Sequence, residues 1–535
     1  MATRRNELKL LSDRVAASPH SLTESDFAAV LSNYSLLDAL TVMGRVSIVI
    51  YRELSQDVLN GIALVEPVGG GIIAQHQLAF LANMAVLSEA IDSSPEMTSQ
   101  EGLATLFILC SLHANGLPDP LLEDSGKLTR DELELGFLIR GIAEQFDFQA
   151  RDGHEAARAT EVFTSAMQEV GPSRRLGDLQ RVFLTETGLS IESYLKTGML
   201  IMSVVWFTRS PVISTSSVAY RLSEFIESGK LSHEEIDHFI RMKSASYGEL
   251  RELDAQLNSG LKDINIKTRL NPLALKPIIQ VQSPSKSMTH VIPNCSLYAR
   301  SVFSGLYWWF HHHFEKIGGG SHLAFREYFG RVFETYMGRV LRNTFGDENV
   351  MSGRDTEGPI EFYDWLVEEK GRVYLIETKA YQLSLRTRQT GNADLFKSEV
   401  EKKVVAAIVQ TYRRRQDLQK HPTLSCIERT TLHTVIVFYD FPLVTRLPNV
   451  PWFRELLART EREHQLPGLA SFQFHLAAAE DLELCSSVLN DSDLATVLSD
   501  YRLSGKMSMT EFVRSKTGVV PRNDYLTERF VGLFY

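Results

Sequence analysis

The sequence has few cysteines, and none is placed for a thiolate metal site. Four occur among 535 residues, and no two of them form a C-x-x-C pair. A zinc knuckle and a disulfide-stapled fold are therefore excluded, and the composition suits a reducing compartment. The four are Cys110, Cys295, Cys426 and Cys485.

Long hydrophobic runs are also lacking. The longest apolar run, Met199–Phe207, is interrupted by Ser203 and is too short to cross a bilayer. Arg4 and Arg5 are followed by charged residues and not by an apolar signal core. We expect a soluble, cytoplasmic protein with no membrane partner.

A phosphate-binding loop is missing as well. The glycines at 69–71 are not followed by Gly-Lys-Ser/Thr. The Ser-Gly-Lys triplets at 125–127 and 228–230 are each followed by leucine, so the hydroxyl that would hold magnesium is absent. We therefore expect no nucleotide site of this type.

The charges that are present divide the chain into two unlike halves. Residues 1–265 carry 22 Lys and Arg against 36 Asp and Glu, a balance of −14, whereas residues 266–535 carry 34 against 30, a balance of +4. Ten basic and four acidic residues lie between Lys379 and Lys420. This asymmetry predicts that the C-terminal half meets nucleic acid and the N-terminal half does not.

The first 265 residues carry helical patterns and no catalytic motif. Capping boxes at Thr129–Glu132 and Ser232–Glu235 each open an apolar-periodic stretch. We interpret residues 1–265 as an all-α scaffold, a sensor, or a surface for a partner protein or for self-association. The domains expected after it are a connector (266–317) with short strands around residues 278–279 and 291–292 and an aromatic helix, a catalytic core (318–480) and a helical tail (481–535).

The connector contains three consecutive histidines, His311, His312 and His313, beside a cluster of aromatic residues. Consecutive positions on a helix point in different directions, so three adjacent histidines cannot share one metal ion. We expect them to be surface or packing residues.

Residues 318–440 alternate helical and β-like patterns. The order is helix, three strands, helix and strand, with polar breaks between them. The predicted elements are a helix at 321–342, strands at 349–353, 360–367 and 372–380, a helix at 393–420 and a strand at 432–439.

The second and third of these strands bring two acids together. A two-residue turn at Lys370-Gly371 places Asp364 directly opposite Glu377, with Cβ atoms about 4.5–5.5 Å apart. Lys379 lies two positions further along and shares their face. A turn of odd length would put the two acids on opposite faces.

Two carboxylates held together repel one another and need a counter-charge. A hard divalent cation bound by oxygens supplies it, and magnesium is usual where phosphates react. A lysine beside the metal can orient or deprotonate water, which suits phosphodiester hydrolysis. The alternative is an exposed salt-bridge pair on an ordinary sheet, and the apolar neighbours on both strand faces disfavour it.

Asp364 followed by Glu377-Thr378-Lys379 resembles the PD-(D/E)XK nuclease superfamily, over roughly residues 320–440. The resemblance implies a multidomain α+β protein whose restriction-endonuclease-like core is a mixed sheet flanked by helices. It also implies Mg²⁺, with Mn²⁺ as a substitute, bound by Asp364, Glu377 and the carbonyl of Thr378, while Lys379 acts on water. Glu334 takes the place of the helix glutamate that joins the metal site in many members.

Two choices remain among the glutamates. E-x-K occurs four times, beginning at Glu7, Glu368, Glu377 and Glu401, and Glu377 alone lies in an apolar strand with an aspartate opposite.

For the helix glutamate, Glu327 lies seven residues before Glu334 on nearly the same face. We prefer Glu334 because a glycine lies one turn away on either side and leaves a bare surface, although a plain surface charge is an alternative.

The helix after E-x-K borders the active site in this superfamily, so Gln410 is expected to contact substrate or metal-bound water. A solvated basic face is the alternative for its cations. The Q-x-x-x-Y signature of RecB-like exonucleases fails because position 414 is arginine, which favours an endonuclease. The expected phosphate contacts are Lys403, Arg413, Arg414, Arg415, Arg386 and Arg388.

These observations predict a magnesium-dependent endonuclease acting on DNA. The layout looks like that of uncharacterised bacterial nucleases associated with defence against phage or foreign DNA. The alternatives are a non-catalytic nucleic-acid-binding or assembly protein with a vestigial nuclease fold, and a nuclease acting on RNA.

Overall fold

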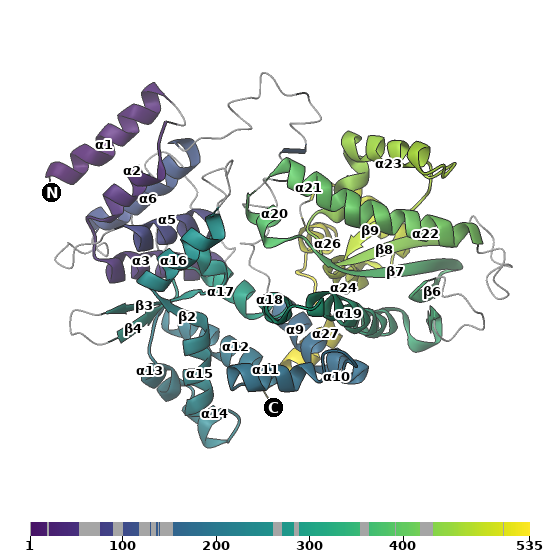
Figure 1. The fold of residues 1–535 in the computed structure, drawn as a ribbon, viewed down its shortest axis with the longest axis horizontal. Coiled ribbons are helices and arrows are strands. Elements are labelled where there is room, and N and C mark those ends of the chain that lie inside the picture. The colour runs from purple at the N-terminus through teal and green to yellow at the C-terminus, as the bar shows by residue number, and fades with distance from the viewer. Residues whose placement is uncertain are drawn as a thin grey trace.

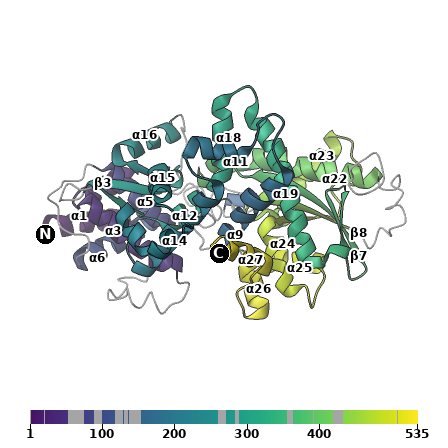
Figure 2. The same cartoon turned by 90° about the horizontal axis from the view of Figure 1, so that it is seen from below.

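The computed structural model has an α+β fold with two lobes (Figure 1), and the same division is visible after a turn of 90° (Figure 2). One lobe contains the N-terminal helices and a small sheet, and the other contains a larger sheet. The structure describes residues 2–18, 21–52, 75–88, 100–116, 129, 135–136, 139, 154–259, 270–282, 288–353, 363–390, 392–417, 432–506 and 508–534.

The first lobe is mainly helical. Its core consists of apolar side chains from six helices, from three strands of the small sheet and from the helix that begins at Cys295. The helices are α1 (Ala2–Ala17), α2 (Glu24–Leu31), α3 (Leu36–Arg52), α5 (Gln75–Leu87), α6 (Gln100–Gly116) and α16 (Tyr247–Asn258).

The small sheet corrects the expectation of an all-α region up to residue 265. Its strand order is β1-β4-β3-β2, and two of its strands precede residue 265 while two follow it. β2 and β3 pair in parallel across the expected boundary, so this boundary does not separate two structural units. The strands are β1 (Val212–Ile213), β2 (Ser244–Ser246), β3 (Ile278–Gln282) and β4 (Met288–Val291).

A helical layer joins the two lobes. The capping box at Ser232 is confirmed, because its hydroxyl accepts a hydrogen bond from the amide of Glu235 at 3.1 Å. The box expected at Thr129–Glu132 lies largely outside the described residues. The layer contains α9 (His154–Thr160), a π-helical turn (Glu161–Ala166), α10 (Met167–Val170), α11 (Leu179–Thr187), α12 (Ile191–Thr208), α13 (Thr215–Arg221), α14 (Ser223–Glu227), α15 (His233–Lys243), α17 (Cys295–Val302) and α18 (Gly305–Ile317).

The larger sheet has five strands in the order β5-β6-β7-β8-β9. β5, β6 and β7 form an antiparallel meander, while β8 is parallel to β7 and β9 is parallel to β8. All four predicted strands after residue 345 are present, with boundaries shifted by a few residues. The strands are β5 (Val350–Ser352), β6 (Trp365–Glu369), β7 (Arg372–Gln382), β8 (Leu432–Asp440) and β9 (His475–Ala478).

Helices cover both faces of this sheet, which explains why its strands are apolar on both sides. α19 (Ser321–Phe345) packs on the face that presents Trp365 and Ile376. The opposite face presents Ile436 and Phe438 to the helix after β7. That helix and its neighbours are α20 (Leu385–Thr390), α21 (Ala393–Glu399), a π-helical segment (Val400–Val405), α22 (Ala406–Gln416) and α23 (Pro451–Glu463).

The expected tail forms four helices that pack back on the second lobe. The core beneath α19 includes side chains from α9, from the sheet and from the tail, so residues far apart in sequence share one core. The tail helices are α24 (Ala479–Cys485), α25 (Leu494–Leu503), α26 (Met509–Thr517) and α27 (Asp524–Gly532).

Within the part of the chain that the structure describes, no single helix has both the length and the apolar character needed to cross a bilayer. α2 and the first part of α3 meet that requirement jointly, with a bend of 109° between them.

Candidate active site

The β6–β7 hairpin has the register that the sequence predicts. Trp365 pairs with Ile376, and the turn consists of Lys370 and Gly371. Both turn residues have positive φ angles, 50° and 76°, as a type I′ turn requires. Asp364 directly precedes the first paired residue of β6, and its amide donates to the carbonyl of Ile376 at 3.2 Å, so Asp364 lies beside the Ile376–Thr378 segment, although the pairing itself ends at Trp365.

Asp364 is fixed by the residue after Glu377. Its Oδ2 accepts hydrogen bonds from the backbone amide and from the hydroxyl of Thr378, both at 2.6 Å. Asp364 is half-buried and directly precedes β6. Thr378 therefore orients the aspartate carboxylate by two bonds, and its side chain is a contact that sequence reasoning missed.

Glu377 is buried and has a cation on each oxygen. Its side chain is 4% exposed. Oε1 lies 2.5 Å from Nζ of Lys379, and Oε2 lies 2.5 Å from Nη1 of Arg414. Lys379 and Arg414 are about one quarter exposed, so the cations form the solvent-facing side of the cluster.

The environment of Glu377 opposes its ionisation. Burial raises the pKa of the Glu377 carboxyl, and the nearby Asp364 carboxylate raises it further. Lys379 and Arg414 lower that pKa and so favour the charged form. Crowded acids that depend on neighbouring cations are typical of catalytic carboxylate pairs.

α22 supplies two members of the cluster. Gln410 Oε1 accepts a hydrogen bond from Lys379 Nζ at 3.0 Å, and Arg414 lies one turn further along the same face. These contacts bring Gln410 and Arg414 to the E-x-K strand, and the expected contact of Gln410 with substrate or metal-bound water stays a prediction. Lys403, two turns earlier in the π-helical segment, lies 5.5 Å from the centre of the Tyr381 ring instead.

Glu334 lies beside the start of β6. The indole of Trp365 donates to the backbone carbonyl of Glu334 at 3.1 Å, which ties this turn of α19 to the residue after Asp364. Glu327 is mostly exposed and lies 4.0 Å from Arg175, away from the hairpin. Of these two glutamates, Glu334 is the one whose backbone contacts the hairpin, and the binding of its carboxylate to metal stays a prediction.

The two glycines near Glu334 have different roles. A Cβ on Gly338 would lie 2.1 Å from the Trp365 ring, so Gly338 gives the indole room to approach. A Cβ on Gly330 would have no atom within 4 Å. The predicted bare surface therefore exists only at Gly330, because the indole fills it at Gly338.

Two predicted phosphate contacts are used inside the protein. Arg388 is 1% exposed and pairs with Asp440 at 2.7 Å, which contradicts the expectation that it contacts nucleic acid. Arg415 donates to the carbonyl of Leu432 and to the hydroxyl of Thr434, both at 3.0 Å, so its guanidinium holds β8. A run of basic residues in the sequence therefore does not show which of its arginines are exposed, because that depends on the elements that pack against them.

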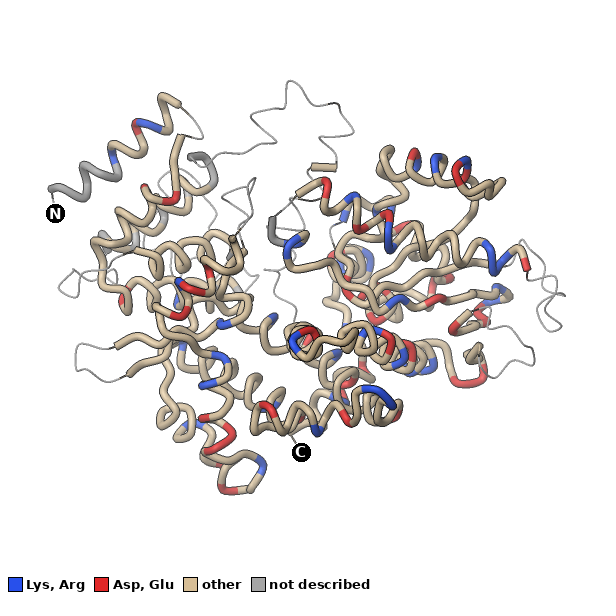
Figure 3. The backbone as a smooth tube through the Cα atoms, viewed as in Figure 1, with Lys and Arg blue, Asp and Glu red and all other residues tan. Residues whose placement is uncertain are grey.

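The other predicted cations are at the surface. Arg413 and Arg386 are exposed, and the end of α22 forms a basic tip (Figure 3). Arg326 on α19 adds a cation that sequence reasoning missed, since its charge acts on both Glu399 and Lys403. The spacing of Glu399 and Lys403 is i, i+4, so the sequence could have predicted that these two residues are neighbours on a helix, but not that Arg326 lies near them.

The remaining E-x-K matches do not form comparable sites. Glu368 is exposed near the end of β6. Glu401 is half exposed and pairs with Arg459 at 2.8 Å. Among the matches whose side chains the structure describes, Glu377 is the buried one, as the apolar strand predicted.

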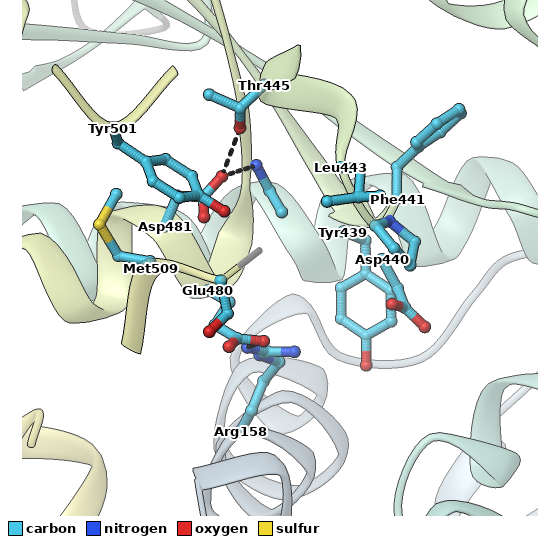
Figure 4. A pocket seen from close by; sticks show the side chains of 13 residues that line it. Arg158, Tyr439, Asp440, Phe441, Leu443, Thr445, Glu480, Asp481, Tyr501 and Met509 are labelled. Atoms are coloured by element: carbon cyan, nitrogen blue, oxygen red, sulfur yellow. Dashed lines mark hydrogen bonds and ion pairs between the residues drawn. The ribbon is translucent and has the colours of Figure 1, made fainter. Parts of the chain in front are cut away.

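A separate cavity lies at the carboxyl ends of β8 and β9 (Figure 4). Asp481 there accepts hydrogen bonds at 2.8 Å from the hydroxyl of Thr445 and from the amide of Ala478. Burial raises the pKa of Asp481 to about 7. Arg158, on the cavity wall, is paired with Glu483. Asp481 and Arg158 therefore each have partners within the protein, which accounts for these polar groups without a ligand.

No family model, no curated protein and no solved structure matches this chain. The arrangement of side chains on the β6–β7 hairpin and α22 is therefore the basis on which a function can be argued.

Proposed function

We propose that this protein is a magnesium-dependent endonuclease that hydrolyses DNA phosphodiester bonds. The observation that carries the proposal is the cluster at the β6–β7 hairpin, where the charge of Asp364 acts on Glu377 and Lys379 pairs with Glu377. The order α19, β5–β7, α21–α22 and β8 supports a restriction-endonuclease-like core, because it repeats the helix, three strands, helix and strand of that fold.

The donor set fits a hard divalent cation. It offers two carboxylates and the carbonyl of Thr378, all oxygen ligands of the kind that magnesium and manganese accept. Burial and Asp364 together raise the pKa of Glu377, so a cation between the two acids would relieve their repulsion. When bound there, magnesium would act as a Lewis acid on a phosphate oxygen and favour an ionised water.

The chain's own residues have distinct tasks in this proposal. Lys379 is anchored by Glu377 and Gln410, so its ammonium is positioned to orient the attacking water by hydrogen bonding and to offset the charge of the phosphate. Arg414 lowers the pKa of Glu377 and presents a guanidinium that can hydrogen-bond a phosphate in a two-point manner. Arg386, Arg413 and Lys403 extend positive charge beyond the cluster.

The substrate class is tested by incubating the purified full-length chain with supercoiled plasmid and with folded RNA. Each reaction contains Mg²⁺, Mn²⁺ or a chelator. The proposal predicts nicked and linear plasmid with either metal and intact plasmid with the chelator. Cleavage of RNA alone would make the protein a ribonuclease. Failure to cut either polymer would favour a non-catalytic protein with a vestigial nuclease fold.

A further inference from the structure

α18 brings together three side chains that can bind a metal, apart from the carboxylate cluster. One donor atom from each of His311, His312 and Glu315 can be chosen so that all three lie within 4.8 Å of one another. We propose that these residues form a transition-metal site that takes Zn²⁺ or a related imidazole-binding ion.

The helix geometry explains why two adjacent histidines can contribute. Glu315 is four residues after His311 and three after His312, so it shares a side of the helix with each of them. His313 does not belong to the set, because its ring stacks on Trp309 with centroids 5.3 Å apart. The run of three histidines does not by itself reveal this set, because the third member, Glu315, lies one turn later on the helix.

The histidines also have room for a ligand. His312 and Glu315 are exposed, so an ion can reach them from solvent. Nδ1 of His311 is buried and has no hydrogen-bond partner among the residues that the structure describes. A buried nitrogen without a partner is unfavourable unless something else binds it.

A further imidazole lies near the three-residue set, across the adjacent turn, although it is not a member of that set. The ring of His322, in the first turn of α19, is 5.9 Å from the ring of His311. Gly318, Gly319 and Gly320 join the two helices with positive φ angles of 78°, 60° and 77°. A metal held by both sides would therefore tie α18 to α19 across a turn made of glycines.

The donor type separates this site from the magnesium cluster. Imidazole nitrogens suit zinc, copper, nickel and iron, whereas magnesium prefers carboxylate and carbonyl oxygens. Two histidines and a glutamate form a recurrent three-residue zinc set that leaves a position for water or for a further ligand. The nearby charges of Arg326 and Lys316 oppose a cation, and Glu315 offsets them in part.

The test is zinc binding by the full-length chain. The purified chain with Glu377→Gln, which weakens the carboxylate cluster, is titrated with ZnCl₂ in competition with a chromophoric chelator. His312→Ala and Glu315→Gln are made in the same background, and His313→Ala is the matched control on the same helix. Because His312 and Glu315 are exposed, both variants are expected to fold, which circular dichroism checks.

We expect one zinc ion per chain, with His312→Ala and Glu315→Gln each weakening its binding by more than about tenfold. His313→Ala should change it by less than about threefold. Replacing zinc by Co²⁺ should give visible absorption bands that His312→Ala removes. The site would be disproved if the background chain bound no zinc, if the two variants bound it as tightly as their background, or if His313→Ala weakened binding as strongly as they do.

Discussion

Glu377 is a buried acid whose two oxygens contact two different cations, Lys379 and Arg414. Burial and Asp364 raise the pKa of its carboxyl, and the two cations lower it. Any ion that binds Glu377 must compete with Arg414. Because Arg414 also lowers the pKa of Glu377, its two effects on metal binding offset one another, and its loss should be felt mainly in catalysis.

Arg414→Ala should lower the maximal rate of plasmid cleavage by about 100-fold, as expected when one donor to a reacting phosphate is lost. The magnesium concentration for half-maximal rate should change little, since the loss of a competing positive charge is offset by the higher pKa of Glu377. Arg413→Ala, one residue earlier and exposed, is the control and should change the rate less than about threefold. Equal effects of the two substitutions would refute the role of Arg414.

At the scale of single residues, the sequence predicted the positions of the acids better than the partners of the cations. Asp364 and Glu377 follow from the turn length and the two-residue period of a strand, which are local properties. Arg388 and Arg414 look alike in sequence, yet one is buried against Asp440 and the other contacts Glu377. Their partners come from other elements, so the sequence pattern could not distinguish them.

Two glycines in α19 test the packing of this helix against the hairpin. Gly338→Ala should lower the free energy of unfolding by about 1–3 kcal/mol, because its Cβ would collide with the Trp365 ring. Gly330→Ala should raise it by up to about 1 kcal/mol, because alanine favours the helix and no atom lies nearby. Urea denaturation measures both. A destabilising Gly330→Ala would show that the space beside Gly330 is filled.

A histidine at the start of β9 gives the sheet a pH-dependent stability. Burial, with His433 and Arg502, lowers the pKa of His475 to about 4 from its usual 6.5. The unfolded chain gains this proton near pH 6.5 and the folded chain only near pH 4, so the contribution of His475 to stability is present above pH 6.5 and is lost as the pH falls.

The stability difference between the parent and His475→Gln should therefore change between pH 7 and pH 4, with the parent losing more stability on acidification. Thermal unfolding of both proteins across this range measures it. A difference that does not vary with pH would show that His475 titrates alike in the folded and unfolded chains.

The elements of the larger sheet were predictable, and so were β3 and β4 of the smaller sheet, whereas β1 and β2 were not. β6, β7 and β8 contain apolar, β-branched and aromatic runs bounded by turn residues. β1 and β2 contain two and three residues, among them Ser244 and Ser246, and form because β4 and β3 lie beside them. Such short strands have no period that a sequence pattern can reveal.

At the scale of the whole molecule, one buried acid links three helices that are far apart in the sequence. Glu483 in α24 accepts hydrogen bonds from Arg158 in α9 at 2.6 and 2.8 Å and from Tyr336 in α19 at 2.7 Å. His154 also contacts it. Arg158 lowers the pKa of Glu483 and keeps it ionised. One carboxylate thus links residues more than 300 positions apart.

Glu483→Ala should destabilise the protein by about 3–5 kcal/mol, because it leaves the buried guanidinium of Arg158 without its partner. Asp500→Asn is the control, since the Asp500–Lys516 pair is exposed, and it should change stability by less than about 0.5 kcal/mol. Urea denaturation followed by circular dichroism measures both. A loss below about 1 kcal/mol for Glu483→Ala would contradict this role.

These long-range contacts also explain why the chain cannot be divided at residue 265. β2 and β3 pair across that position, and α9 shares a core with the tail. The expectation that the acidic N-terminal half does not bind DNA therefore has to be tested in the full-length chain. The charge and helical patterns of each half are local, and contacts between segments distant in the sequence leave no local pattern from which they could be predicted.

The most direct measurement of the central claim is magnesium-dependent plasmid cleavage by three proteins: the parent, Glu377→Gln and Glu368→Gln. Glu368 begins another E-x-K match on the same hairpin and is exposed, so it is the matched control. We predict that Glu377→Gln loses cleavage while it keeps its fold and its binding to DNA, and that Glu368→Gln cuts like the parent. Equal cleavage by Glu377→Gln and the parent would contradict the assignment of this hairpin as the active site.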